Sequence, residues 1–126
     1  MYYTEYAKPF VENKIALAQQ AIKGGDQQQA FRYLEDAHVI AQKSTYLHCL
    51  VHYLMLKHGY IQWNIKEMSG QIFRLVGALT KTWIGWIPTG NTGGTNVSPF
   101  KPMPISAHNQ KIIDVIEQKI KQQIKQ

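Results

Sequence analysis

Three histidines in the middle of the chain have the spacing of a metal-binding set. His48 and His52 are four positions apart, so a helix would place both imidazoles on one face, within reach of the same ion. His38 lies on the preceding helical segment and would face them if the two segments form a hairpin. Three imidazoles with an open position suit zinc, copper or another borderline cation. Glu35, one turn before His38, could be a fourth ligand or orient an imidazole.

The same residues have a simpler interpretation, in which the histidines are buried and hydrogen-bonded to the backbone or to asparagines. Asn91 and Asn96 lie in a downstream segment that could lean over the histidines and close a pocket. The candidate ligand pocket is therefore Glu35, His38, His48, His52, Asn91 and Asn96, of which the three histidines are the candidate metal ligands. Cys49 would point about 100° away from His48 around the helix, so we interpret it as a small core residue.

The segments that carry these residues are predicted to be helices, because apolar residues recur at helical spacing with capping residues between them. The first helix is expected from about Thr4 to the glycine pair at 24 and 25. Asp26 is predicted to cap a second helix to about Gln42, and Ser44 a third over Thr45 to His58, ended by Gly59. A fourth is expected from Asn64, or slightly earlier, to about Lys81, and Ser106 should cap the last.

The fourth segment has an apolar stripe, which we expect to be its buried face. The stripe consists of Ile61, Ile65, Met68, Ile72, Leu75, Val76 and Leu79.

A repeat length supports a hairpin arrangement. Gly25 and Gly59 are 34 positions apart, the period of tetratricopeptide hairpins, although the second unit matches that pattern poorly. The predicted fold is all-α: four to five helices in a single domain over 1–126. Tetratricopeptide-like helical hairpins span about 4–82, a long C-terminal strap about 83–105, and a final helix about 106–125.

The strap holds four of the five prolines and has no helical or strand periodicity. Apolar residues such as Trp83, Trp86 and Phe100 argue against disorder, so we predict an ordered segment that crosses the helices.

Composition narrows the classes of function. The 126 residues carry a net charge of +6, but the cations are spread singly, which is not typical of a nucleic-acid surface. No apolar run approaches the roughly 20 residues of a membrane span, and no signal peptide is evident. With one cysteine and no intramolecular disulfide, a cytoplasmic location is expected.

The strap also carries a family resemblance. Its sequence GWIPTGNTGGTNVSPFKPMPI, together with His48, His52, Met55, Leu56 and Gly59, resembles the bacterial domain-of-unknown-function family 3703. The similarity covers roughly positions 30 to 106. It implies a small all-helical protein and assigns no biochemical activity.

Two functions remain open from the sequence. We favour, on base rates alone, a non-catalytic module with a histidine-lined pocket that binds a protein or peptide through its hairpin groove or its C-terminal helix. The alternative is a metal-binding protein or small metalloenzyme that holds zinc or copper with His38, His48 and His52. No recognisable catalytic set is present, and the sequence does not predict an oligomeric state.

Overall fold

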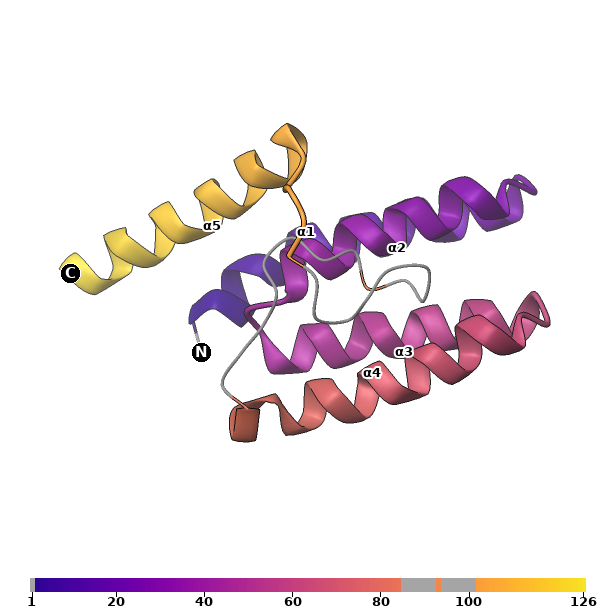
Figure 1. Cartoon of the computed structure of the whole chain (residues 1–126). Helices are drawn as coiled ribbons and strands as arrows, with labels where there is room; N and C mark the ends of the chain where they lie inside the picture. The colour runs from indigo at the N-terminus through magenta and orange to yellow at the C-terminus, as the bar shows by residue number, and fades with distance from the viewer. Residues whose placement is uncertain (1, 85–92, 94–101) are drawn as a thin grey trace.

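The structure is a computed structural model that describes residues 2–84, 93 and 102–126. These residues form five helices and no strand (Figure 1). The helices are α1 (Tyr2–Lys23), α2 (Gln27–Ala41), α3 (Thr45–Ile61), α4 (Ile65–Ile84) and α5 (Ala107–Lys125). The predicted all-α class is confirmed. None of the described helices combines the length and apolar character that a membrane crossing requires.

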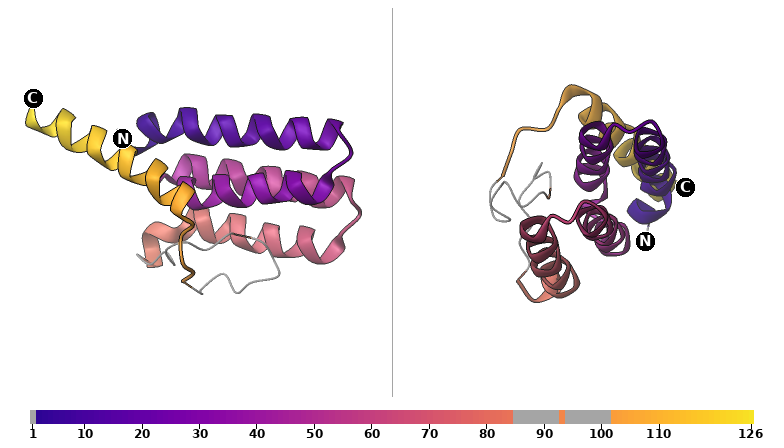
Figure 2. Two further views of the ribbon diagram at one scale, coloured as in Figure 1. Left: turned by 90° about the horizontal axis from the view of Figure 1, so that it is seen from above. Right: turned by 90° about the vertical axis from the view of Figure 1, so that its right-hand side faces the viewer.

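The helices are arranged as two antiparallel hairpins and a last helix that packs across the first of them. α1 pairs with α2 and α3 with α4, and α2 lies beside α3, while α5 crosses the start of α1 and projects from the body (Figure 2). The likeness to tetratricopeptide repeats remains a prediction. Most of the predicted strap, including Asn91 and Asn96, lies outside the described residues.

The predicted capping residues are confirmed. Asp26, Ser44 and Ser106 each accept a hydrogen bond from the backbone N–H three positions later, at 3.0, 3.2 and 3.2 Å respectively. Gly25 has a φ of +82° in the turn between α1 and α2, a backbone conformation that glycine adopts without steric cost.

The predicted end of α3 at Gly59 is wrong. The helix continues to Ile61, and the turn that follows places Trp63 at a φ of 55°. Gly59 is buried within α3, where a Cβ would lie 3.4 Å from Glu67 and Met68 of α4. It therefore permits a close approach of two helices and does not end one.

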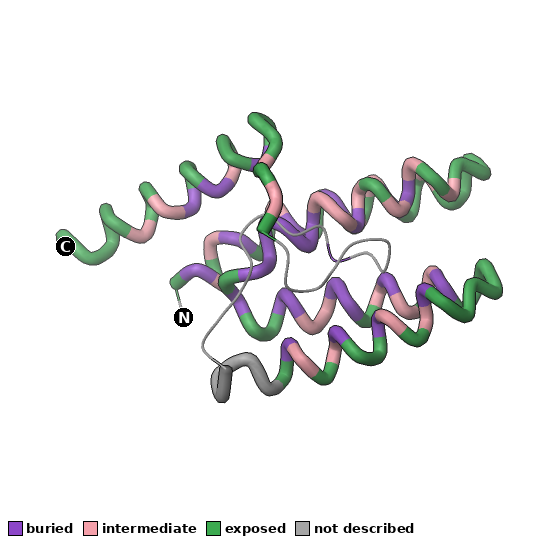
Figure 3. Tube along the Cα trace, in the orientation of Figure 1, coloured by how far each residue is buried: buried purple, intermediate pink, exposed green. Residues whose placement is uncertain are grey.

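The core lies between α1, α2 and α3, with a contribution from α5 (Figure 3). Val11, Ile40, Leu47 and Met55 are among its fully buried side chains. The Tyr3 hydroxyl donates to the Ile40 carbonyl at 2.7 Å and ties α1 to α2, and burial raises the pKa of this phenol to about 12.

The predicted orientation of α4 is also wrong. The apolar stripe predicted for it points outward: Ile65, Ile72, Val76 and Leu79 of α4 are exposed, as is Ile61 at the end of α3. Within residues 65–79 of α4, the buried residues are instead Glu67, Gln71, Arg74 and Ala78. The physical reason is that α3 presents the buried His52 to α4. A buried imidazole requires a hydrogen-bonding partner, which an apolar side chain cannot supply.

A buried lysine holds α5 in place. Lys14 of α1 is only 6% exposed, and its Nζ lies 2.8 Å from Nε2 of His108 and 3.9 Å from the Asp36 carboxylate. Asn109 donates to the same carboxylate at 2.9 Å. This polar cluster links α5 to both α1 and α2, and so fixes the position of the last helix.

Candidate metal centre

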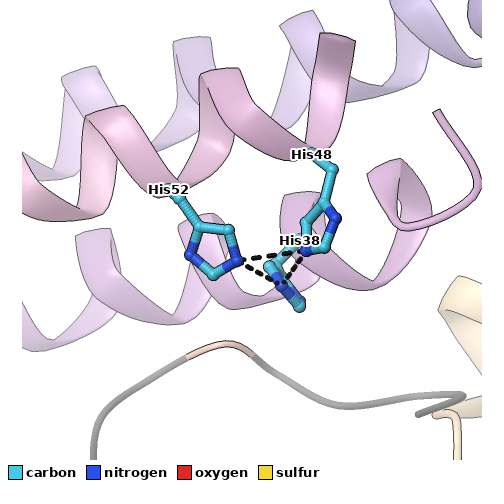
Figure 4. Close-up of side chains that lie close together, drawn as sticks. All are labelled: His38, His48 and His52. Carbon is cyan, nitrogen blue, oxygen red and sulfur yellow. Dashed lines mark hydrogen bonds between the residues drawn. The ribbon is translucent and has the colours of Figure 1, made fainter. Parts of the chain in front are cut away.

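The structure brings the three predicted histidines into contact. His38 projects from α2, and His48 and His52 project from α3, with their Nε2 atoms converging (Figure 4). The Nε2 atom of His38 lies 3.0 Å from that of His48 and 3.1 Å from that of His52, and the last two are 3.1 Å apart. The side chains are buried, with exposures of 2%, 8% and 2%.

The convergence follows from local sequence. His48 and His52 share one face of α3 because they are four positions apart. The short turn between Ala41 and Thr45 places α2 beside α3. Ser44 is fully buried in that turn and caps α3. The spacing and the cap together place His38 opposite the other two imidazoles.

Gln71 of α4 fixes the tautomer of His52. The Gln71 amide nitrogen donates to Glu67 Oε1 and to the Gly93 carbonyl, both at 2.7 Å, and both of these oxygens accept. Its Oε1 must therefore face His52 Nδ1, at 2.6 Å, which must carry the proton. The proton-free Nε2 of His52 then points into the cluster, as metal ligation requires.

Gly93 packs directly on His38. A Cβ at position 93 would lie 2.6 Å from His38 Cδ2 and 2.9 Å from its Nε2, and the φ of Gly93 is +84°. The backbone of residue 93 thus approaches the imidazole more closely than any residue with a side chain would allow. It supports two of the candidate ligands: His38 by contact, and His52 through Gln71.

The surroundings of His52 favour its neutral imidazole. The pKa of His52 is lowered to about 4, chiefly by burial; its hydrogen bond to Gln71 and the charge of Glu67 raise it, and the charge of Arg74 lowers it. The pKa of the Arg74 guanidinium is itself lowered by burial, against the raising effect of Glu67. Near neutral pH, His52 thus offers a lone pair.

A pH dependence of stability follows for the metal-free protein. Unfolded His52 has a pKa near 6.5 and folded His52 near 4, so the unfolded chain binds more protons between these values. Stability should therefore be lost as the pH falls from 6.5 to 4, by roughly 3 kcal/mol at most from this residue. Urea unfolding at pH 7 and pH 4.5 in chelator should show a smaller loss for His52→Gln than for the wild type. Equal losses would contradict this assignment.

The other predicted site residues are not part of the cluster. Among the described residues, only His38, His48 and His52 form a group whose ligand atoms lie within 4.8 Å of one another. Glu35 is half-buried and outside this group, so its role as a ligand or orienting residue remains a prediction. Cys49 is half-buried rather than a core residue, and Asn91 and Asn96 lie outside the described residues.

Sequence reasoning missed Glu67, Gln71 and Gly93. Glu67 and Gln71 are four positions apart and would share a helical face, which is a usable signal. However, Glu67 and Gln71 lie on the polar face of an amphipathic helix. Such a face is normally predicted to meet solvent, because the apolar face opposite is expected to be buried.

These features define a small helical protein with a buried cluster of three histidines. A family model described as "Protein of unknown function (DUF3703)" matches residues 5–113, and the chain belongs to this family. Searches of curated proteins and of solved structures gave no match.

Proposed function

We propose that this protein binds a transition-metal ion, zinc or copper, through the Nε2 atoms of His38, His48 and His52. The observation that carries the proposal is their mutual separation of 3.0–3.1 Å. Three such contacts need three protons between the nitrogens, but His52 carries its proton on Nδ1. While the imidazoles are neutral, at most two of the three contacts can be hydrogen bonds. A cation that accepts all three lone pairs removes this mismatch.

The dimensions suit such an ion. With metal–nitrogen bonds of about 2.0–2.1 Å, nitrogens separated by 3.0–3.1 Å subtend an angle of about 95° at the metal. This value lies between the ideal octahedral and tetrahedral angles, so the three ligands would occupy one face of the ion. The opposite face would remain for a further ligand.

The donor set narrows the choice of metal. Imidazole nitrogen suits zinc, copper, nickel and iron, whereas magnesium and calcium require oxygen ligands. The described cluster offers only imidazoles. Gln71 supports this interpretation, because a metal-bound histidine usually donates its other N–H to a carbonyl or carboxylate. We therefore favour metal binding over the interaction module that the sequence alone suggested.

Elemental analysis of untagged protein, purified without chelator, tests the proposal. The wild type should contain close to one zinc or copper ion per chain, or take up one when titrated with either metal. The variant His48→Gln/His52→Gln should contain and take up none. His58→Gln is the matched control: His58 lies on the same helix, contacts Gln27 and Phe31, and is outside the cluster.

Two results would contradict the proposal. One is a wild-type protein that neither contains zinc or copper nor retains either metal after titration and dialysis. The other is equal uptake by the double histidine variant and the wild type, which would place the binding elsewhere on the chain.

A further inference from the structure

The outward face of α4 has the pattern of a helix-pairing surface. Ile65, Ile72 and Leu79 are spaced by seven residues and are 74%, 52% and 61% exposed. Met68 and Leu75 are half-buried and occupy the intermediate positions of the same heptads. Apolar residues at the first and fourth heptad positions form the seam along which two helices pack. We name these five residues the α4 seam.

Further exposed apolar residues widen this surface. Ile61 and Trp63 precede the seam, and Phe73 and Val76 flank it, with exposures between 54% and 81%. Together with the seam, they expose roughly 600 Å² of apolar side chain, estimated from the area such side chains usually bury. This exposed apolar area is at the upper end of the range found for the largest apolar patch on a typical monomer. It is also close to the roughly 800 Å² that each partner buries in a stable interface.

The charges around the seam are compatible with a second copy of the same chain. The positions beside the seam are Ser69 and Val76 on the exposed edge, whereas Gln71 and Ala78 on the other edge are buried against the chain itself. Paired helices choose unlike partners mainly through charges at these positions. Neither exposed edge residue is charged, and among residues 65–79 only Lys66 is both charged and exposed, so two identical seams would meet with little like-charge repulsion and no need for a charged partner.

We propose that two copies of this chain pair through the α4 seam to form a two-fold symmetric dimer. Such an interface uses the same surface on both chains. Ile72 is at the centre of the seam, seven residues from Ile65 and from Leu79. It therefore lies next to its own copy whether the two helices run parallel or antiparallel. The proposal is independent of the histidine cluster, which faces the other side of α4.

Sedimentation of the full chain in the presence of chelator tests the proposal. The wild type should sediment at twice its chain mass of 14.5 kDa at micromolar concentrations. Ile72→Glu should sediment as a monomer with an unchanged helical circular dichroism spectrum. The control Ile124→Glu makes the same replacement at an isoleucine of α5 that is 69% exposed, and it should remain a dimer.

Cross-linking keeps the proposal testable if Ile72→Glu does not fold. Ile72→Cys, oxidised with diamide, should give a covalent dimer, whereas the wild type, with only the half-buried Cys49, and Ile124→Cys should not. A wild type that is monomeric at about 100 µM, far above the micromolar range in which the proposal expects a dimer, would overturn the proposal. So would a dimer that persists in Ile72→Glu, or a covalent dimer formed equally by Ile124→Cys.

Discussion

Addition of zinc to chelator-treated protein is expected to raise its melting temperature by about 10–20 °C. A ligand that binds only the native state at 1,000 times its dissociation constant stabilises that state by about 4 kcal/mol. In a domain of this size, each kcal/mol corresponds to a few degrees. The shift should be large because the fold holds the three imidazole nitrogens 3.0–3.1 Å apart, where all three can reach one ion. Little ordering remains to oppose binding.

Differential scanning calorimetry with and without zinc would measure this shift. The variant His48→Gln/His52→Gln should show almost none, because one imidazole cannot hold the ion. His58→Gln should shift as the wild type does. If the double variant and the wild type were stabilised equally, the ion would be acting at another site.

Replacement of Gly93 by alanine is expected to weaken zinc binding at least tenfold. The new Cβ would lie 2.6 Å from Cδ2 and 2.7 Å from Cγ of His38, distances that real Cβ atoms essentially never show. His38 is 2% exposed and in contact with two other imidazoles, so its ring cannot turn aside without leaving the cluster. The φ of +84° adds a backbone cost of about 1 kcal/mol or more for alanine.

Gly25→Ala separates the clash from the backbone cost. Gly25 has nearly the same φ, +82°, but a Cβ at this position would meet no atom within 4 Å, so alanine there is strained without a collision. Competition with a chromophoric chelator should show wild-type zinc affinity for Gly25→Ala and weakened affinity for Gly93→Ala. Unchanged affinity in Gly93→Ala would show that His38 is not a ligand or that the backbone at residue 93 moves freely.

The histidine cluster was predictable because its geometry is local. The four-residue spacing of His48 and His52 requires only that α3 be a helix, and the position of His38 requires only that α2 and α3 form a hairpin. Asp26 and Ser44 marked the helix starts, since short polar side chains satisfy the first N–H groups of a helix. Each inference used residues near one another in sequence.

The orientation of α4 was not predictable in this way. Periodicity shows that a helix has an apolar face, but not whether that face meets the body of its own chain or something else. Here the buried His52 needs a hydrogen-bonding neighbour on α4. Glu67 and Gln71 therefore face the body of the chain, and the apolar face of α4 faces outward. Gly93 was equally hidden, because only the folded chain brings it to His38.

The candidate ligands also lie close together along the chain, with His52 only 14 positions after His38. Closing so short a loop costs little conformational entropy. During synthesis, α2 and α3 emerge before α4, and Gln71 is 19 positions beyond His52. An ion captured at that stage would act as a folding nucleus, with α4 then closing over a loaded site. If the denatured chain also bound the ion through these nearby residues, the native state would gain less than the 4 kcal/mol expected for an ion that binds the native state alone.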